Sequence, residues 1–146
     1  MPSGVHDQQG VRQRRLRGEL GEQLAADYLV SLGYVQIARN RRVGSREIDI
    51  VAALGDLCVL VEVRARSDRA MVGALASIGT RKRQTLIAAA ELVWPLLQVE
   101  SPHLQRVRLD VVAVTFGAAK PVVEHFPGAI ERSAQREREL HDFSHE

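Results

Sequence analysis

The first regular pattern in the chain is a helical one. Between residues 13 and 32, apolar side chains recur every three to four positions, which predicts an amphipathic helix closed by Gly33. We expect its core-facing stripe to be Leu16, Leu20, Leu24 and Tyr28, with Ala25, Leu29 and Leu32 beside them.

After this helix, the pattern changes to two-residue alternation, which predicts a three-stranded meander. A short strand is expected at 35–37, followed by a basic loop at 39–42. Two β-rich runs come next, at 47–54 and 57–66, separated by the turn residues Gly55-Asp56.

The second half of the chain begins with another helical pattern at 78–94, and Pro95 is expected to end or kink this helix. The run from Arg106 to Phe116 is apolar on both faces, which is typical of a central strand. A last short strand is expected at 121–126.

Together these elements predict a single α/β domain in the order α-β-β-β-α-β, with a mixed central sheet flanked by helices. We expect the domain to cover residues 13–127. Residues 1–12 are polar and are predicted to form a disordered N-terminal arm, and residues 128–146 a charged C-terminal tail.

Charge and composition exclude several classes of protein. Twenty basic against 18 acidic residues leave a formal charge of only +2, so the chain is not a generally polycationic protein. The single cysteine, Cys58, excludes a disulfide framework within the chain. No secretory signal or membrane-spanning run is present, which predicts a soluble cytoplasmic protein.

Carboxylates on the predicted hairpin give the strongest chemical signal. If Gly55-Asp56 is a two-residue turn, position 54 faces position 57, which sets Asp49 opposite Glu62 and Glu47 opposite Arg64. Two-residue alternation then puts these four side chains on one face of the sheet. The opposite face is expected to be core and carries Ile48, Ile50, Val59, Val61 and Val63.

Directly opposed residues have β-carbons about 5 Å apart, where two carboxylates repel by about 3 kcal/mol at an effective dielectric near 20. Such a pair requires a proton or a cation, and oxygen ligands suit Mg²⁺ or Mn²⁺, the ions of phosphodiester hydrolysis. A second interpretation stays open. Arg46, Arg64 and Arg66 can neutralise the acids in a surface network, and a one-residue register shift would separate Asp49 from Glu62.

Several motifs in a fixed order make the sequence resemble the YraN family over about residues 15 to 116. They are Gly21-Glu22-x-x-Ala25-Ala26-x-x-Leu29, Arg39-Asn40-x-Arg42, Glu47-Ile48-Asp49, Val61-Glu62-Val63-Arg64-x-Arg66, Lys82 and Arg108-Leu109-Asp110-Val111-Val112. That family is similar in fold to Holliday-junction resolvases of the PD-(D/E)XK nuclease superfamily. The resemblance therefore implies a restriction-endonuclease-like core, whose element order is the one predicted above.

The resemblance also implies a catalytic and metal-binding site. Asp49 and Glu62 take the metal-ligand positions, the backbone carbonyl of Val63 adds a ligand, and Glu22 on the first helix completes the acidic cluster. Helical spacing places Glu22 at the edge of the apolar face, from which it can point toward the sheet.

Two positions depart from the family pattern. Arg46 stands where Gly usually precedes Glu-Ile-Asp, and Arg64 stands where the family usually has Lys. A lysine can orient or deprotonate the attacking water, whereas arginine stays protonated and can only hold the water or stabilise phosphate charge. Catalysis would then be slowed or absent unless Lys82 substitutes as base or phosphate ligand, and Lys82 is equally well explained as a solvated helix-end charge.

Basic residues near these acids are candidate contacts to nucleic-acid phosphates, although each can also be an ordinary solvated charge. The aromatic content of 4% argues against single-strand recognition by stacking and favours duplex or junction binding. The candidates are Arg39, Arg41, Arg42, Arg46, Arg66, Arg81, Lys82 and Arg83.

Two expectations concern buried residues outside this site. Asp110 lies in an otherwise apolar strand and should pair with an Arg or Lys, for which Arg66 and Lys82 are candidates. Trp94 is expected to be a core residue. None of the five histidines has spacing suited to metal chelation, and we expect no role for them.

Three functions remain open from the sequence. The first is a Mg²⁺- or Mn²⁺-dependent nuclease acting on structured or branched nucleic acid, with DNA expected more than RNA. The second is a nucleic-acid-binding module that kept the fold but lost hydrolysis, and the third is an interaction scaffold that uses its acidic tail. Resolvase-like relatives commonly pair as dimers, so a homodimer is compatible with the first two.

Overall fold

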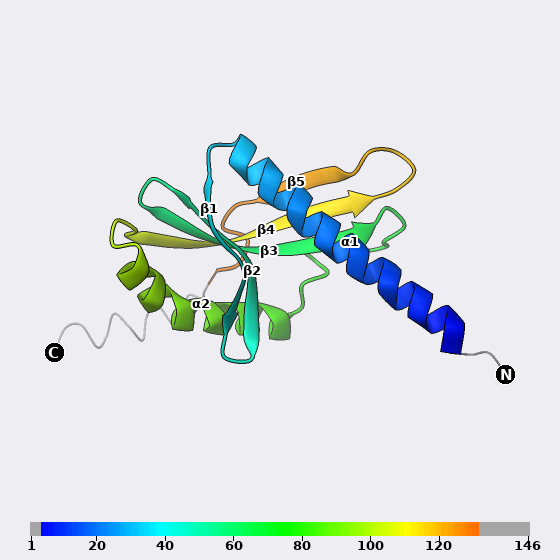
Figure 1. Ribbon diagram of the computed structural model, residues 1–146, viewed down its shortest axis with the longest axis horizontal. Helices are drawn as coiled ribbons and strands as arrows, with labels where there is room; N and C mark the ends of the chain where they lie inside the picture. The colour runs from blue at the N-terminus through cyan, green and yellow to red at the C-terminus, as the bar shows by residue number, and fades with distance from the viewer. Residues whose placement is uncertain (1–3, 132–146) are drawn as a thin grey trace.

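The computed structural model describes residues 4–131, which form a five-stranded mixed sheet with one long helix on each face (Figure 1). The strands lie in the order β1-β2-β3-β4-β5, and only β3 and β4 are parallel. The predicted α/β class, mixed sheet and element order are therefore confirmed. The elements are α1 (Gly4–Ser31), β1 (Val35–Val43), β2 (Arg46–Leu54), β3 (Leu57–Ser67), α2 (Thr80–Glu100), β4 (Arg106–Phe116) and β5 (Val122–Phe126).

Helix α1 packs on the sheet through the second half of the predicted apolar face, which includes Leu24, and not through its first two leucines. Ala25, Ala26 and Leu29 are buried against the α1-facing side of β2, β3 and β4. Leu16 and Leu20 are 57% and 50% exposed, so the prediction that they face the core is wrong. The physical reason is close approach, because a small-residue face lets the helix lie nearer the sheet than leucines would.

Gly21 marks the closest point of this approach and gives a test with a matched control. A β-carbon at Gly21 would lie 2.9 Å from Cβ of Ala65, whereas one at Gly18 meets nothing within 4 Å. We expect Gly21→Ala to destabilise the protein by about 1–3 kcal/mol through overpacking. Gly18→Ala should stabilise it by about 0.5–1 kcal/mol through helix propensity. Urea unfolding of both variants measures this, and equal shifts would contradict the packing.

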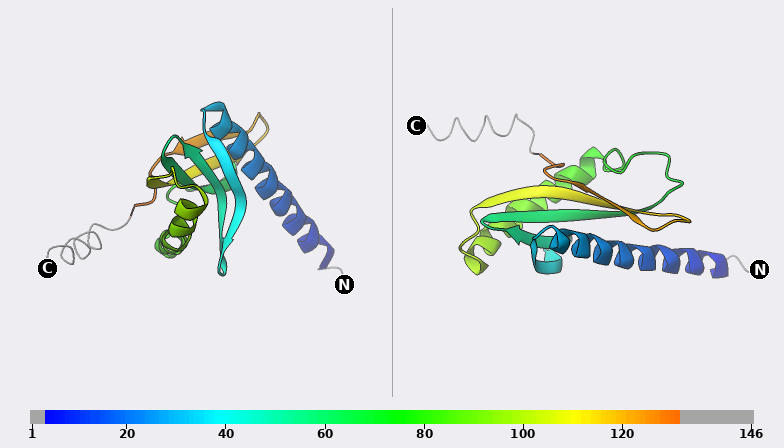
Figure 2. Two further views of the ribbon diagram at one scale, coloured as in Figure 1. Left: turned by 60° about the vertical axis from the view of Figure 1, so that its left-hand side comes forward. Right: turned by 90° about the horizontal axis from the view of Figure 1, so that it is seen from above.

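Helix α1 begins at Gly4, nine residues before the predicted start, so the expectation that residues up to 12 are disordered is wrong for 4–12. Glutamine and arginine are good helix formers, and they continue the helix without any apolar periodicity. Figures 1 and 2 show this half of α1 extending past the sheet. At the other end Gly33 has a φ of 95°, and the predicted closure at this residue is confirmed.

The basic segment 39–42 is part of strand β1 and not a loop, which corrects the prediction. Arg41 and Arg42 pair with Ile48 and Glu47 of β2. Charged side chains obscure the strand pattern here, since β1 is an edge strand and Val43 is the only one of its nine residues that is buried.

Helix α2 covers the opposite face of the sheet, where Val93 and Leu97 pack against residues that include Val51, Cys58 and Leu60. The helix runs through Pro95 to Glu100, so of the two predicted alternatives, an end or a kink at Pro95, the end is wrong. Proline removes one helical hydrogen bond, and burial of side chains on both sides of it holds the helix together. Trp94 is partly buried against the same cluster, as predicted.

Asp110 of β4 is fully buried in a polar network. Its carboxylate accepts hydrogen bonds from Arg108 at 2.7 and 2.8 Å and from the Gly128 amide at 2.9 Å, and it lies 2.7 Å from Nε2 of His125. An arginine partner was predicted, but Arg108 holds this place, not Arg66 or Lys82. His125, to which the sequence assigned no role, is a structural partner.

The described chain continues past the predicted domain end. Ile130 is 4% exposed and packs with residues of α2 and β4, so 128–131 belong to the packed domain and not to a tail. The rest of the predicted acidic tail lies outside the described residues. Within the described part, neither helix offers an apolar stretch long enough to span a lipid bilayer.

Candidate functional site

The site lies where β2 and β3 part. The predicted hairpin register is confirmed from Leu54↔Leu57 to Ile50↔Val61, but the pairing ends there. One residue further, Oδ2 of Asp49 accepts a hydrogen bond from the Val63 amide at 2.8 Å. A side-chain carboxylate thus replaces the backbone acceptor that a continued ladder would supply, and a gap opens between the strands.

The alternation of β2 also breaks at this point. Ile50 packs in the cluster on the α1 side of the sheet, whereas Ile48 packs in the cluster on the α2 side. Glu62 meets Lys82 of α2, while Glu47 lies beside the side chain of Asn40, which also contacts α1. The prediction that Glu47, Asp49, Glu62 and Arg64 share one face is therefore wrong, because β2 twists at Asp49.

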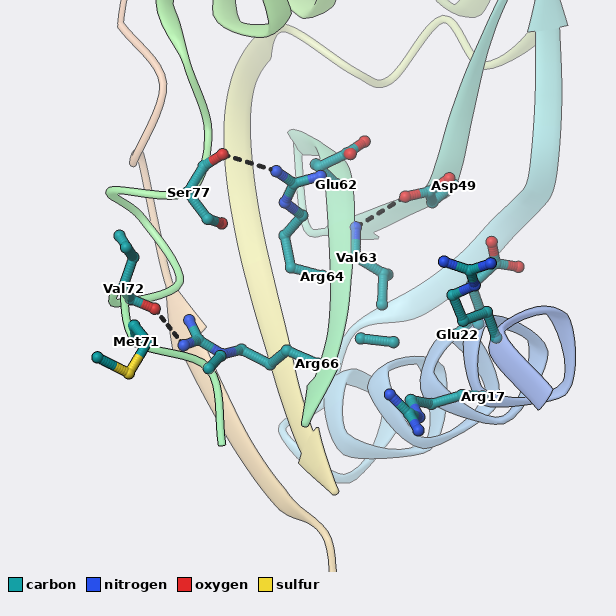
Figure 3. A pocket seen from close by; sticks show the side chains of 14 residues that line it. Arg17, Glu22, Asp49, Glu62, Val63, Arg64, Arg66, Met71, Val72 and Ser77 are labelled. Carbon is teal, nitrogen blue, oxygen red and sulfur yellow. Dashed lines mark hydrogen bonds between the residues drawn. The ribbon is translucent and has the colours of Figure 1, made fainter. Parts of the chain in front are cut away.

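Three predicted acids nevertheless line one cleft, of about 650 Å³. Glu22 comes from α1, Asp49 from β2 and Glu62 from β3, and Figure 3 shows Asp49 between the other two. The wall opposite α1 is formed by β3 and by residues of the segment 70–77. The parted strands expose all three carboxylates to the same solvent space.

Asn40 organises the α1 side of this cleft. It has a φ of 51°, a left-handed conformation that asparagine tolerates better than most residues. Its side-chain nitrogen, turned toward the carboxylates, lies 3.1 Å from Oε2 of Glu22 and 3.0 Å from Oε1 of Glu47. Arg39 adds an ion pair, with Nη2 3.6 Å from Oε2 of Glu22. The sequence reasoning missed Asn40, although an asparagine among arginines in a strand was the available signal.

Burial and repulsion between neighbouring carboxylates determine the electrostatics of the site. Burial raises the pKa of Asp49 to about 7, and the negative charge of Glu62 adds to this shift, while the Val63 amide and Lys82 oppose it. Burial also raises the pKa of Glu22, followed by the charge of Asp49. At neutral pH these acids therefore favour an added proton or cation.

The donor set suits a hard divalent cation. The negative charges of Glu62 and Glu22 both interact with that of Asp49, and all three carboxylates line the same cleft. In an extended strand the N–H and C=O of one residue point to the same side, so the Val63 carbonyl faces the same gap as its amide. Among the described residues, no three acidic, histidine or cysteine side chains are gathered closely enough to enclose an ion as they stand.

Two basic residues next to the acids have different partners. Nη2 of Arg64 donates to the carbonyl of Ser77 at 2.9 Å, which turns this guanidinium away from Asp49 (Figure 3). Nζ of Lys82 lies 3.5 Å from Oε1 of Glu62, whose side chain is only 8% exposed. The cation that faces the buried carboxylate is therefore Lys82 and not Arg64.

Of the other predicted phosphate contacts, Arg66 lines the cleft and donates to the carbonyl of Val72. Arg41 is drawn to the end of α2 by two hydrogen bonds to Glu100, at 2.6 and 2.9 Å. Arg42 is an exposed side chain of β1, 3.9 Å from Glu47.

The remaining predicted contacts lie away from the acids. Arg46, Arg81 and Arg83 line a separate hollow beside the start of α2. Arg83 has a structural task there, since it donates to three backbone carbonyls, those of Leu75, Ile78 and Ala129.

Two cleft residues were missed by the sequence reasoning. Arg14 and Arg17 of α1 line the same cleft as the acids. Their spacing to Gly21 puts them on the helix face that packs on the sheet, and this was the available signal.

Comparison with known proteins gives consistent matches over most of the chain. A model of the uncharacterised protein family UPF0102 matches residues 21–114, a range that contains all the acids of the cleft. A UPF0102 protein of Anaeromyxobacter dehalogenans is 41% identical over 118 residues, which are 81% of this chain and 86% of the relative. One of Methylococcus capsulatus is 44% identical over 81% of this chain and 93% of the relative, and one of Chloroflexus aurantiacus is 48% identical over 70% and 81%. The chain belongs to UPF0102, the YraN family, as its motifs predicted.

Proposed function

We propose that this chain is a metal-dependent nuclease-like protein that binds structured nucleic acid, DNA in preference to RNA, and hydrolyses phosphodiester bonds. The observation that carries the proposal is the meeting of Asp49 and Glu62 where β2 and β3 part, with the pKa of Asp49 raised to about 7. A restriction-endonuclease-like core is part of the proposal. The antiparallel meander β1-β2-β3, followed by α2 and the parallel strand β4, supports it.

In this proposal, Asp49, Glu62 and the Val63 carbonyl hold Mg²⁺ or Mn²⁺, with Glu22 completing the negative charge around the ion. When bound, the ion makes a water more acidic and offsets charge on the phosphate under attack. Asn40 and Arg39 hold the Glu22 carboxylate in the cleft.

Basic side chains supply the second part of the chemistry. Lys82, at the buried carboxylate of Glu62, can hold the attacking water by donating a hydrogen bond from Nζ, and it can take the proton of that water only as the neutral amine, after its own proton has passed to solvent. Arg64 keeps guanidinium N–H groups for phosphate contact, because the Ser77 carbonyl takes only one of its nitrogens.

Replacing these two residues separately tests this division of roles. We expect Lys82→Gln to lower the initial rate of cleavage by about 100-fold, the typical contribution of a general acid or base. Arg64→Gln, which removes one positive charge as well, should lower it by less than about 10-fold, that is about 1.4 kcal/mol. A greater loss in Arg64→Gln would reverse the assignment.

A second candidate function is a binding module of the same fold without hydrolysis. Two observations favour it, the arginine at position 64 and the absence of a closed three-acid cluster among the described residues. In this case Arg64→Lys would restore cleavage that the natural chain lacks, and the protein would be a degraded enzyme.

Incubation with branched and linear DNA in Mg²⁺ or Mn²⁺ distinguishes the two functions. Cleavage that disappears in Asp49→Asn supports the nuclease. Complete inactivity with retained, salt-sensitive binding would support the module. Cleavage that is unchanged in Asp49→Asn would belong to a contaminant or another site.

A further inference from the structure

The half of α1 that extends past the sheet is rich in arginine and largely exposed. We call residues 8–18 the α1 arm. None of them is buried, and they include Arg12, Arg14, Arg15 and Arg17 but no acidic residue. At 1.5 Å per residue the arm is about 16 Å long, and Figures 1 and 2 show it projecting from the body of the molecule.

The four arginines lie on two different faces of the arm. Arg14 and Arg17 line the cleft that holds the acids, on the helix face that continues into Gly21 and Ala25. Arg12 and Arg15 are not among the residues that line this cleft. Arg15 forms an exposed ion pair with Glu19 at 3.5 Å. Within the described chain, Arg14 and Arg17 have no such ion-pair partner.

The cleft is therefore lined by acidic and basic side chains together. Arg14 and Arg17 of α1 line one side of the cleft, and Figure 3 shows Arg64 and Arg66 of β3 on the side away from Arg17. The guanidinium group of arginine can donate two parallel hydrogen bonds to phosphate oxygens, and such contacts do not depend on base sequence. No aromatic side chain lines the cleft, so it offers no platform on which unpaired bases could stack.

We propose that the α1 arm binds the sugar–phosphate backbone of double-stranded nucleic acid, with Arg14 and Arg17 contacting phosphates next to the acidic centre. This inference rests on the proposed function, because it places the substrate in the same cleft. It deepens that function by naming a duplex as the substrate class and by adding a contact surface. A straight helix of this length spans about five base pairs of duplex, at 3.4 Å per pair.

Binding without metal tests the proposal separately from cleavage. The affinity for a labelled blunt duplex is measured by fluorescence anisotropy in EDTA, over a range of salt concentrations, for the wild-type chain and two double variants. We expect Arg14→Gln with Arg17→Gln to weaken binding by about 10-fold or more and to reduce the salt slope by about 2, as expected for two lost phosphate contacts. The matched control, Arg12→Gln with Arg15→Gln, removes the same charge from the same helix and should change affinity by less than about 3-fold.

Other results would overturn the inference. Equal losses in the two double variants would mean that only net charge matters. Tighter binding of a single strand than of the duplex would contradict the substrate class. If the wild-type chain cleaves DNA but binds no duplex, this inference fails and the proposed function remains. If the chain binds duplex through Arg14 and Arg17 but cleaves no DNA, the inference remains and the proposed function fails. Circular dichroism of both variants verifies that α1 remains helical.

Discussion

Asp49→Asn is expected to make the metal-free protein more stable at pH 8 while it abolishes cleavage. The pKa of Asp49 is raised to about 7 in the folded state, above the ordinary aspartate value of 3.8, first by burial and then by the charge of Glu62. A raised acid pKa means that the folded state binds more protons between these values, so stability falls as pH rises from about 4 to about 7. Asparagine keeps an acceptor for the Val63 amide and carries no charge.

The raised pKa corresponds to at most about 4 kcal/mol at pH 8, at about 1.4 kcal/mol per pKa unit, and the expected gain in unfolding free energy should vanish near pH 4, where Asp49 is protonated. Chemical denaturation at both pH values measures it. Asp56→Asn is the control, because Arg106 lowers the pKa of this turn carboxylate and its loss should give no stabilisation at pH 8. Destabilisation by Asp49→Asn at pH 8 would contradict the claim that the negative charge of Asp49 lowers the stability of the metal-free protein.

The same substitution should lower cleavage by about 100-fold or more, which corresponds to ~3 kcal/mol of transition-state stabilisation. A gain in stability together with a loss of activity separates a functional carboxylate from a structural one. Substitution of a carboxylate with a structural role would instead lower stability and activity together. Refolded and natively purified Asp49→Asn should behave alike in the cleavage assay.

Asp110→Ala is expected to have the opposite signature, a loss of about 3–5 kcal/mol of stability, as for a broken buried ion pair. The variant leaves the guanidinium of Arg108 and the Gly128 amide without their carboxylate partner. Asp110→Asn keeps an acceptor and should cost clearly less. Urea unfolding measures both, and a loss below about 1 kcal/mol in Asp110→Ala would contradict the structural role.

The contribution of Asp110 to stability depends on pH in the opposite direction to that of Asp49. Burial alone would raise the pKa of Asp110, but hydrogen bonds from Arg108, Gly128 and His125 outweigh it and the pKa is lowered. The stability that this network contributes is present above the ordinary pKa of an aspartate and is lost as pH falls through the lowered value. Asp110→Asn should therefore flatten the acid side of the stability profile.

Local chemistry made some of the fold predictable from the sequence. The Gly55-Asp56 turn and two-residue alternation gave the correct register up to Ile50 and Val61, because a two-residue turn allows one pairing only. The run 106–116, with apolar residues on both faces, was correctly identified as an interior strand, which pairs on both sides with β3 and β5.

Close packing and strand parting were not predictable in this way. Hydrophobicity favoured Leu16 and Leu20 as the buried face of α1, but the distance between helix and sheet at Gly21 selects small residues. The end of pairing at Asp49 is set by a side-chain acceptor, and no periodicity encodes it. Asn40, Arg14 and Arg17 reach the site from elements whose relative placement only the tertiary structure gives.

The central claim is that the carboxylates of the cleft bind one divalent cation, and titration with Mn²⁺ followed by electron paramagnetic resonance tests it most directly. The account predicts one Mn²⁺ site per wild-type chain at pH 8, with affinity reduced by about 10-fold or more in both Asp49→Asn and Glu62→Gln, as ligand loss commonly does. Glu47→Gln, which removes a nearby carboxylate that does not line the cleft, should leave affinity nearly unchanged. Absence of a site in the wild-type chain, or equal affinity in all these variants, would contradict the account.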